Sequence, residues 1–247
     1  MSWMGKIFGG SVGFMLGGPL GLIIGGMLGH HTIDKGAAGI SRLESRQAVF
    51  FTATFALLGK LSKADGQVSA AEITLVERVM RDNLRLDDRS RQIAIRIFNQ
   101  AKDSDAEFMD YAHQFYQEFS GQQQMLTMLL ELLLLLAYAD GELHPAEEAM
   151  LQDVAQLFHS ESIYHRLKEK YADETIPLDA HYETLGCRKG DSIRTVKKKY
   201  RKLAMEYHPD RIQSQGLPPE LAAAAESKFK DIQNAYDEVE KHVGSRR

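Results

Sequence analysis

A histidine, a proline and an acid stand together at the end of a basic helical run, in the stretch LAMEYHPDRIQ. His208 and Asp210 could form a general acid–base pair. Two residues on a tip supply no pocket, no nucleophile and no third group that would orient the base, so catalysis is the weaker interpretation. Pro209 favours another use, because a proline pushes the preceding residue out of the α region. It is expected to end the helix at His208 and to fix the tip for binding.

Acids at matching positions of two repeated segments, residues 55–80 and 130–158, form a second candidate site. Each segment is predicted to be an apolar helix, then Ala-Asp-Gly, then an acid-headed second helix. Hard cations bind carboxylate oxygens, so these acids could form a metal site. Metal binding is nevertheless the minor interpretation. Helix capping explains the same residues, and Pro145 suits the first position of a helix. The four acids are Asp65, Glu72, Asp140 and Glu147.

Other chemistries find little support. Cys187 is the only cysteine, so one chain can form neither a disulfide nor a cysteine-based metal site. No P-loop occurs, and the basic run RTVKKKYRK is weak support for nucleic-acid binding in a chain of net charge −4. We therefore expect no enzymatic activity, no cofactor and no nucleic-acid partner.

An uncharged stretch near the N-terminus, Ile7 to Leu28, is long enough to cross a bilayer as a helix. Glycine recurs at every fourth position, which places a groove of small residues along one helix face and predicts a homodimer. Only Lys6 precedes the span, whereas Lys35, Arg42 and Arg46 follow it. The positive-inside rule then places the N-terminus in the periplasm and the rest in the cytoplasm. The glycines are Gly9, Gly13, Gly17, Gly21, Gly25 and Gly29.

The elements that must position these residues are all helical. Helix formers dominate and strand signals are scarce, so the fold class is predicted to be all-α. The leucine-rich helix around residues 132–136 is too short for a second span and includes Glu131, so a buried core helix is predicted.

Two apolar stripes organise the C-terminal region. From residue 181 onward, 14 basic and 10 acidic side chains make this region about +4, while the rest is about −8. A short helix at 182–185 and a long helix capped by Asp191 and ending near Tyr207 are predicted. The next helix should start near Pro219, and the two long helices should pack as an antiparallel hairpin with an exposed loop, 208–217, at its tip.

These patterns resemble known families. Residues 50–158, with their duplicated acidic motif, resemble the TerB-like helical domains. HYETLG, IRTVKKKYRKLAMEYHPDR and KFKDIQNAYDEV together resemble a J domain of the DnaJ family. Over its full length the chain resembles the membrane-anchored DnaJ-like co-chaperones of Gram-negative bacteria. The glycine/phenylalanine-rich segment and the zinc module of full DnaJ proteins are missing, and Lys199 stands where a small residue is usual.

The resemblance implies a function and a set of site residues. The J domain would dock on a DnaK-type chaperone, and act through it with a nucleotide-exchange factor, stimulating ATP hydrolysis at the inner membrane. A metal- or stress-sensing membrane scaffold that acts through the TerB-like domain is the alternative. The implied docking residues are Lys197, Tyr200, Arg201 and Lys202, with His208, Pro209 and Asp210 as the trigger and Arg211 assisting.

The expected organisation has six parts. They are a periplasmic tip (1–6), a transmembrane helix (7–30), a juxtamembrane segment (31–49), a TerB-like domain (50–170), a linker (171–180) and a J domain (181–247).

Overall fold

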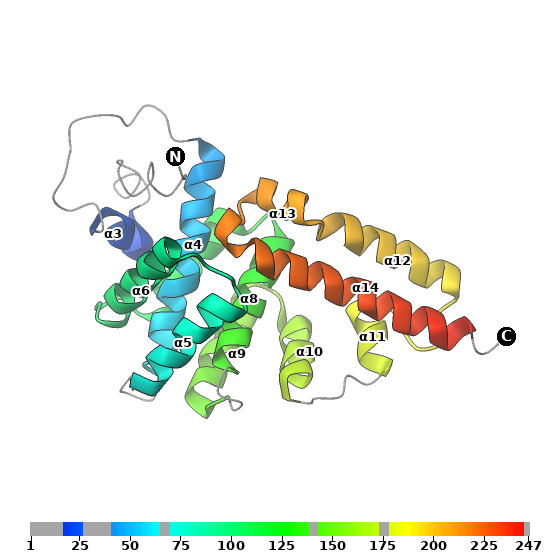
Figure 1. The fold of residues 1–247 in the computed structure, drawn as a ribbon. Coiled ribbons are helices and arrows are strands. Elements are labelled where there is room, and N and C mark those ends of the chain that lie inside the picture. Colours follow the sequence, from blue (N-terminus) through cyan, green and yellow to red (C-terminus); the bar gives the residue numbers. More distant parts are fainter. Residues whose placement is uncertain (1–16, 27–40, 65–69, 139–142, 173–177, 245–247) are drawn as a thin grey trace.

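The computed structural model describes residues 17–26, 41–64, 70–138, 143–172 and 178–244. Helices and the turns between them account for these ranges, with no strand in them, so the prediction of an all-α fold is confirmed. A bundle of helices forms the central part of the molecule, and a long two-helix hairpin projects from one side of it (Figure 1).

The central bundle consists of seven helices within the described ranges. The two repeated units are confirmed as helix pairs, α4 with α5 and α8 with α9, and further helices complete the bundle around them. The helices are α4 (Arg42–Leu61), α5 (Ala70–Asp82), α6 (Asp88–Lys102), α7 (Phe108–Phe119), α8 (Gln123–Ala137), α9 (Pro145–Leu157) and α10 (Glu161–Ala172).

Helices α4 and α8 form the buried axes of this bundle. α4 starts with a capping box in which Ser41 Oγ accepts from Glu44 N and Glu44 accepts from Ser41 N. Between Gln47 and Leu61 nearly every side chain of α4 is buried. α4 and α6 approach closely at Gly59, where an added Cβ would lie 2.3 Å from the Phe98 carbonyl oxygen. The leucine-rich α8 is buried along most of its length, as predicted.

Aromatic rings fill the space between α4, α7 and the end of α9. Phe50 meets Phe115 edge-on with ring centroids 5.4 Å apart, and Phe119 at 5.9 Å. Phe115 in turn reaches Phe158 at 5.9 Å. Aromatic pairs of this kind add to the energy of burial, so these rings tie α4 and α7 to the end of α9.

The C-terminal region forms the predicted antiparallel hairpin. Its elements are α11 (Leu178–Thr184), α12 (Ile193–Glu206), α13 (Pro209–Gln215), a 3₁₀ turn (Pro219–Leu221) and α14 (Ala222–Gly244). α12 and α14 lie side by side, and α11 packs against α14 (Figure 1). The stripes meet as expected: Val196 is fully buried, and the rings of Tyr200 and Tyr236 stack at 4.3 Å.

Two local predictions for this region are wrong. The cap of α12 is Ser192, whose Oγ accepts from Thr195 N at 3.2 Å, whereas Asp191 accepts from Arg188 N in the preceding turn. The first helix of the region starts at Leu178 instead of residue 182, since Leu178 packs on the core.

The described part of the predicted membrane span is the short helix α3 (Gly18–Gly26). Its Leu20 and Ile23 are buried, and Gln114 of α7 accepts from Leu20 N at 2.9 Å and donates to Gly17 O at 2.8 Å. Within the described ranges, no helix has both the length and the apolar character that a bilayer span requires. Most of the predicted span, residues 7–30, lies outside those ranges.

Candidate functional site

The tip of the hairpin is a helix start, which corrects the prediction of a loop over residues 208–217. Pro209 occupies the first position of α13, where a missing N–H costs nothing and the fixed φ suits the helix. His208 is the N-cap, with φ −58° and ψ 131°, and its Nδ1 accepts from Asp210 N at 3.3 Å. The proline therefore ends one helix and begins the next within three residues.

The trigger residues face solvent on one side of this tip. His208 and Asp210 have side chains 51% and 91% exposed, and Arg211 is exposed as well. The imidazole lies edge-on to the ring of Phe229 in α14, with centroids 5.6 Å apart. The imidazole thus contacts Phe229 through its ring and the Asp210 N–H through Nδ1, while its side chain stays half-exposed.

The opposite side of the tip is buried, which the sequence did not predict. Ile212 and Leu217 are fully buried, and α13 packs against α4 and α8 of the central bundle as well as against α14. A side chain at Gly216 would be strained by the φ of +125° and tightly placed, since its Cβ would lie 3.0 Å from Arg46 Cβ. The tip is therefore joined to the central bundle.

A single exposed face of α12 leads to the tip, and we call it the basic face. Its residues are spaced by three and four, so they share one side of the helix. Met205, 64% exposed, lies at the end nearest His208 and is the one apolar member. The sequence reasoning omitted Met205, although its spacing of four from Arg201 could have indicated it. The face consists of Arg194, Lys197, Lys198, Arg201, Lys202 and Met205.

Two basic-helix residues lie apart from that face. Tyr200 is half-buried in the hairpin, stacked on Tyr236, so its ring contributes to the α12–α14 contact. Lys199 turns toward the start of the helix, where its Nζ donates to the Gly186 carbonyl and lies 3.7 Å from Asp191. Lys199, the departure from the family pattern, thus closes the α11–α12 turn.

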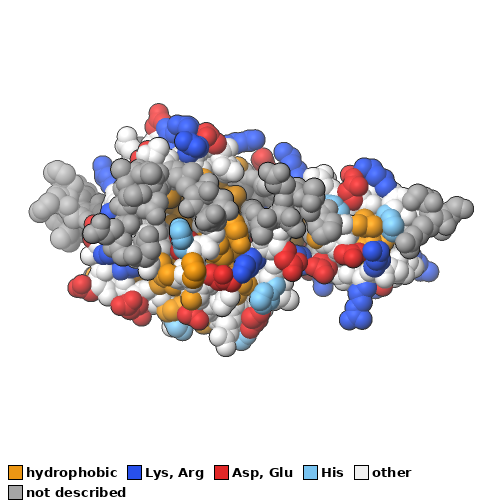
Figure 2. Space-filling model, turned by 90° about the horizontal axis from the view of Figure 1, so that it is seen from below, with side chains coloured by type: hydrophobic (Ala, Val, Ile, Leu, Met, Phe, Trp, Pro, Cys, Tyr) orange, Lys and Arg blue, Asp and Glu red, His pale blue; other side chains and the backbone are white. Residues whose placement is uncertain are grey.

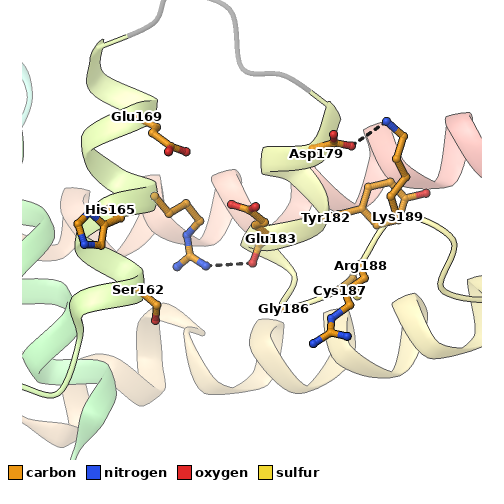
Figure 3. Close-up of a pocket in the computed structure, with 11 residues that line it drawn as sticks. Ser162, His165, Glu169, Asp179, Tyr182, Glu183, Gly186, Cys187, Arg188 and Lys189 are labelled. Carbon is orange, nitrogen blue, oxygen red and sulfur yellow. Dashed lines mark hydrogen bonds and ion pairs between the residues drawn. The ribbon is translucent and has the colours of Figure 1, made fainter.

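A cleft of about 680 Å³ separates α10 from α11 at the other end of the hairpin (Figure 3). Arg166 of α10 donates across the cleft to the Glu183 carbonyl of α11 at 2.9 Å, and on the other wall Lys189 lies 3.0 Å from Asp179. Burial raises the pKa of the Cys187 thiol. His165 and Cys187 lie on opposite walls, so the pair is not arranged for nucleophilic catalysis.

Seen from below, acidic and basic side chains are interspersed over the molecule (Figure 2).

The predicted acidic cluster is only partly covered by the described residues. Asp65 and Asp140 lie outside them, as does the side chain of Glu72. Glu147 accepts from His144 N at 3.2 Å and so caps α9, as the capping interpretation requires. Where side chains are described, no three of the types that bind metals come together.

The predicted glycine groove is described at three of its six positions. Gly21 and Gly25 lie in α3, and Gly17 precedes that helix with φ +57°. Gly9, Gly13 and Gly29 lie outside the described residues.

Three family models match in chain order. A transmembrane domain of the co-chaperone DjlA matches residues 1–42, the tellurite resistance protein TerB matches 51–167, and the DnaJ domain matches 180–243. No solved structure matches. An exposed His-Pro-Asp tip on an α12–α14 hairpin, together with the DnaJ match, defines the class: this is a J-domain co-chaperone.

Relatives over the full length specify the family. The chain is 36% identical to Co-chaperone protein DjlA of Shewanella oneidensis, over 100% of both chains. It is 33% identical to the protein of the same name from Coxiella burnetii, over 98% of both, and 30% identical to that of Escherichia coli K12, over 99% of both. The chain belongs to the DjlA family of membrane-anchored co-chaperones.

Proposed function

We propose that the J domain binds a DnaK-type chaperone and stimulates its ATP hydrolysis. The observation that carries the proposal is the exposure of both parts: the cations of the basic face of α12 are exposed, and His208 and Asp210, which follow at the end of that helix, are exposed as well. Exposed cations along one helix face attract an acidic partner and set its orientation. The nucleotide-exchange factor would then meet this protein only through the chaperone.

The residues contribute differently to chaperone binding according to their position on α12 and the tip. Lys197, Arg201 and Lys202 provide the electrostatic contact, and Met205 adds an apolar contact beside the tip. His208 and Asp210 reach the chaperone in a geometry that Pro209 has already fixed, so binding orders little additional backbone. Arg211, the next exposed residue after Asp210, adds a further positive charge to the tip.

The test is steady-state phosphate release by a DnaK-type chaperone, with the full chain held in lipid nanodiscs. We expect stimulation by the parent and none by His208→Gln, because the exposed imidazole contributes little packing energy and its loss leaves the fold intact. The matched control is Lys189→Gln in the α11–α12 turn, which should stimulate like the parent. Equal stimulation by His208→Gln would refute the proposed function.

Membrane placement is a second part of the proposal. We propose an inner-membrane anchor with the N-terminus in the periplasm and both domains in the cytoplasm, because basic residues follow the uncharged stretch and only Lys6 precedes it. Protease added to intact spheroplasts should leave the domains uncut, and lysed spheroplasts should expose them. Cleavage of the domains in intact spheroplasts would reverse this topology.

We further propose that the glycine groove supports a homodimer through the anchor. Glycines at a spacing of four allow two helix backbones to approach closely. Replacing Gly9, Gly13 and Gly29 with leucine should preserve insertion and weaken cross-linking between copies. Unchanged cross-linking of the inserted variant would show that these glycines do not form the contact.

A further inference from the structure

One ion pair joins the J domain to the central bundle in a nearly dry setting. Glu131 of α8 accepts from Lys228 Nζ of α14, and the two side chains are only 12% and 11% exposed. Glu131 is the acid that interrupts the leucine-rich run of α8. An acid in such a run is costly unless a partner compensates it, and here the partner comes from the other domain.

The same lysine contacts the residue that precedes the trigger. Lys228 Nζ lies 5.6 Å from the ring centroid of Tyr207, which is the C-cap of α12 and is only 8% exposed. A cation over an aromatic face is attractive, and the more so when little water screens it. Glu131, Lys228 and Tyr207 therefore form a chain of contacts that ends one residue before His208.

The neighbouring residue on α14 completes the connection. Phe229 follows Lys228 and meets the His208 ring edge-on at 5.6 Å. Consecutive helical residues point about 100° apart, so one turn of α14 presents Lys228 to the central bundle and Phe229 to the trigger. Fixing Lys228 fixes the rotation of α14 that places Phe229 under the imidazole.

The far end of α13 is held by a second contact. Gly216 lies against Arg46 and Phe119, whose Cε1 would be 3.3 Å from an added Cβ. The guanidinium of Arg46 stacks on the Phe119 ring at 4.5 Å and lies 3.4 Å from Glu118. The tip thus rests on the central bundle both before and after the trigger.

We infer that Glu131 is a positioning residue for co-chaperone activity: through Lys228 it holds Tyr207 and Phe229, and so sets the geometry of the His208-Pro209-Asp210 tip. The TerB-like domain then holds the tip of the J domain in the geometry that stimulation requires. The inference rests on the proposed stimulation of a DnaK-type chaperone. Glu131 itself lies in α8 and is not part of the basic face of α12, so a substitution there does not change that face.

The test compares Glu131→Gln with the parent in the full chain. Loss of the carboxylate leaves Lys228 buried with a neutral partner, which should loosen the tip. Hydrogen–deuterium exchange of amides 208–217 should rise about tenfold, a measurement that needs no chaperone. In the chaperone assay the maximal stimulated rate should fall by a similar factor. The concentration that gives half of that maximum should change little, since the basic face is intact.

Two further variants keep the test decisive. Glu148→Gln is the matched control, because Glu148 pairs with Lys168 inside the central bundle; both readouts should stay at the parent's level. The double variant Glu131→Met with Lys228→Met replaces the pair by apolar side chains of similar length, which commonly preserves stability. It should restore slow exchange at the tip and most of the maximal rate.

The outcomes separate the two proposals. If the parent itself fails to stimulate the chaperone, the proposed function fails, while the exchange data still test positioning. If Glu131→Gln matches the parent in tip exchange and in maximal rate, the positioning role is wrong. The positioning role is equally wrong if Glu131→Met with Lys228→Met restores slow exchange at the tip while the maximal stimulated rate stays low.

Discussion

The two faces of residues 207–217, which we call the tip segment, differ in exposure to solvent. On one face His208 and Asp210 are exposed; on the other Tyr207, Ile212 and Leu217 are buried. A recognition element normally gains from exposure and a domain joint from burial. Here eleven residues serve both purposes, because the helix that starts at Pro209 directs residues at its start to solvent and Ile212, further along its first turn, to the central bundle.

The largest effect is expected from a change on the buried face. Ile212→Ala removes a fully buried side chain at the contact with the central bundle and should lower the free energy of unfolding by about 2–5 kcal/mol. Arg211→Ala, one residue earlier and exposed, should change it by less than about 0.5 kcal/mol. Chemical denaturation followed by circular dichroism measures both. Equal effects would mean that the two faces do not differ as described.

Tyr207, on the buried face of the tip segment, should make the free energy of unfolding fall at alkaline pH. Burial, followed by the nearby Glu131 carboxylate, raises the pKa of Tyr207 from 10.0 to about 12. The unfolded chain loses this proton near pH 10 and the folded chain only near 12. Stability is therefore fully retained below pH 10 and declines between pH 10 and 12, by about 3 kcal/mol from this group.

Tyr207→Phe should remove that part of the decline. Burial also contributes to the raised pKa of Tyr236, about 12, although its hydrogen bond to Glu240 is the larger cause, so a decline from Tyr236 should remain. Unfolding midpoints measured from pH 8 to 12 provide the comparison. Profiles that coincide for the parent and Tyr207→Phe would contradict the assignment.

Charge reversal on the exposed face should alter binding while leaving stability unchanged. The double variant Arg201→Glu with Lys202→Glu should weaken chaperone binding about tenfold at low salt, and added salt should narrow the difference. Arg188→Glu with Lys189→Glu introduces the same charge change in the α11–α12 turn and should have little effect. Chaperone affinity measured at two salt concentrations tests this prediction. An equal loss of affinity in both double variants would mean that net charge alone, and not its position on α12, determines binding.

The smallest effect is expected from Met205→Ser. Removing one exposed apolar contact beside the tip should weaken chaperone binding about threefold, with no change in the salt dependence. Isothermal titration calorimetry measures both quantities. An affinity equal to the parent's would leave Met205 outside the docking surface.

Much of the hairpin was predictable from sequence. The stripes on α12 and α14 follow directly from their helical spacing, and the buried Val196 and Ile232 confirm them. Ser192 was missed as the cap because it and Asp191 are adjacent residues of equal capping ability. α13 was missed for a similar reason: a proline that stops one helix can be the first residue of another, and only the following contacts decide.

The junction between the domains could not be predicted from local patterns. Lys228 looks like a surface residue on an amphipathic helix, and Glu131 like a polar interruption in a leucine run. Each side chain is explained only by the other, 97 residues away. Periodicity reports which face of a helix is apolar and carries no information about which distant element supplies a charge.

That long separation has a consequence for how the chain is made. α4 and α8 leave the ribosome well before α14, so the platform for the J domain can already be packed when the last helices emerge. Non-local contacts close late, since the entropy of bringing distant segments together must be overcome first. We therefore expect the joint at Gly216 and Lys228 to close late in folding, and the trigger to gain its working geometry only after α14 has been synthesised.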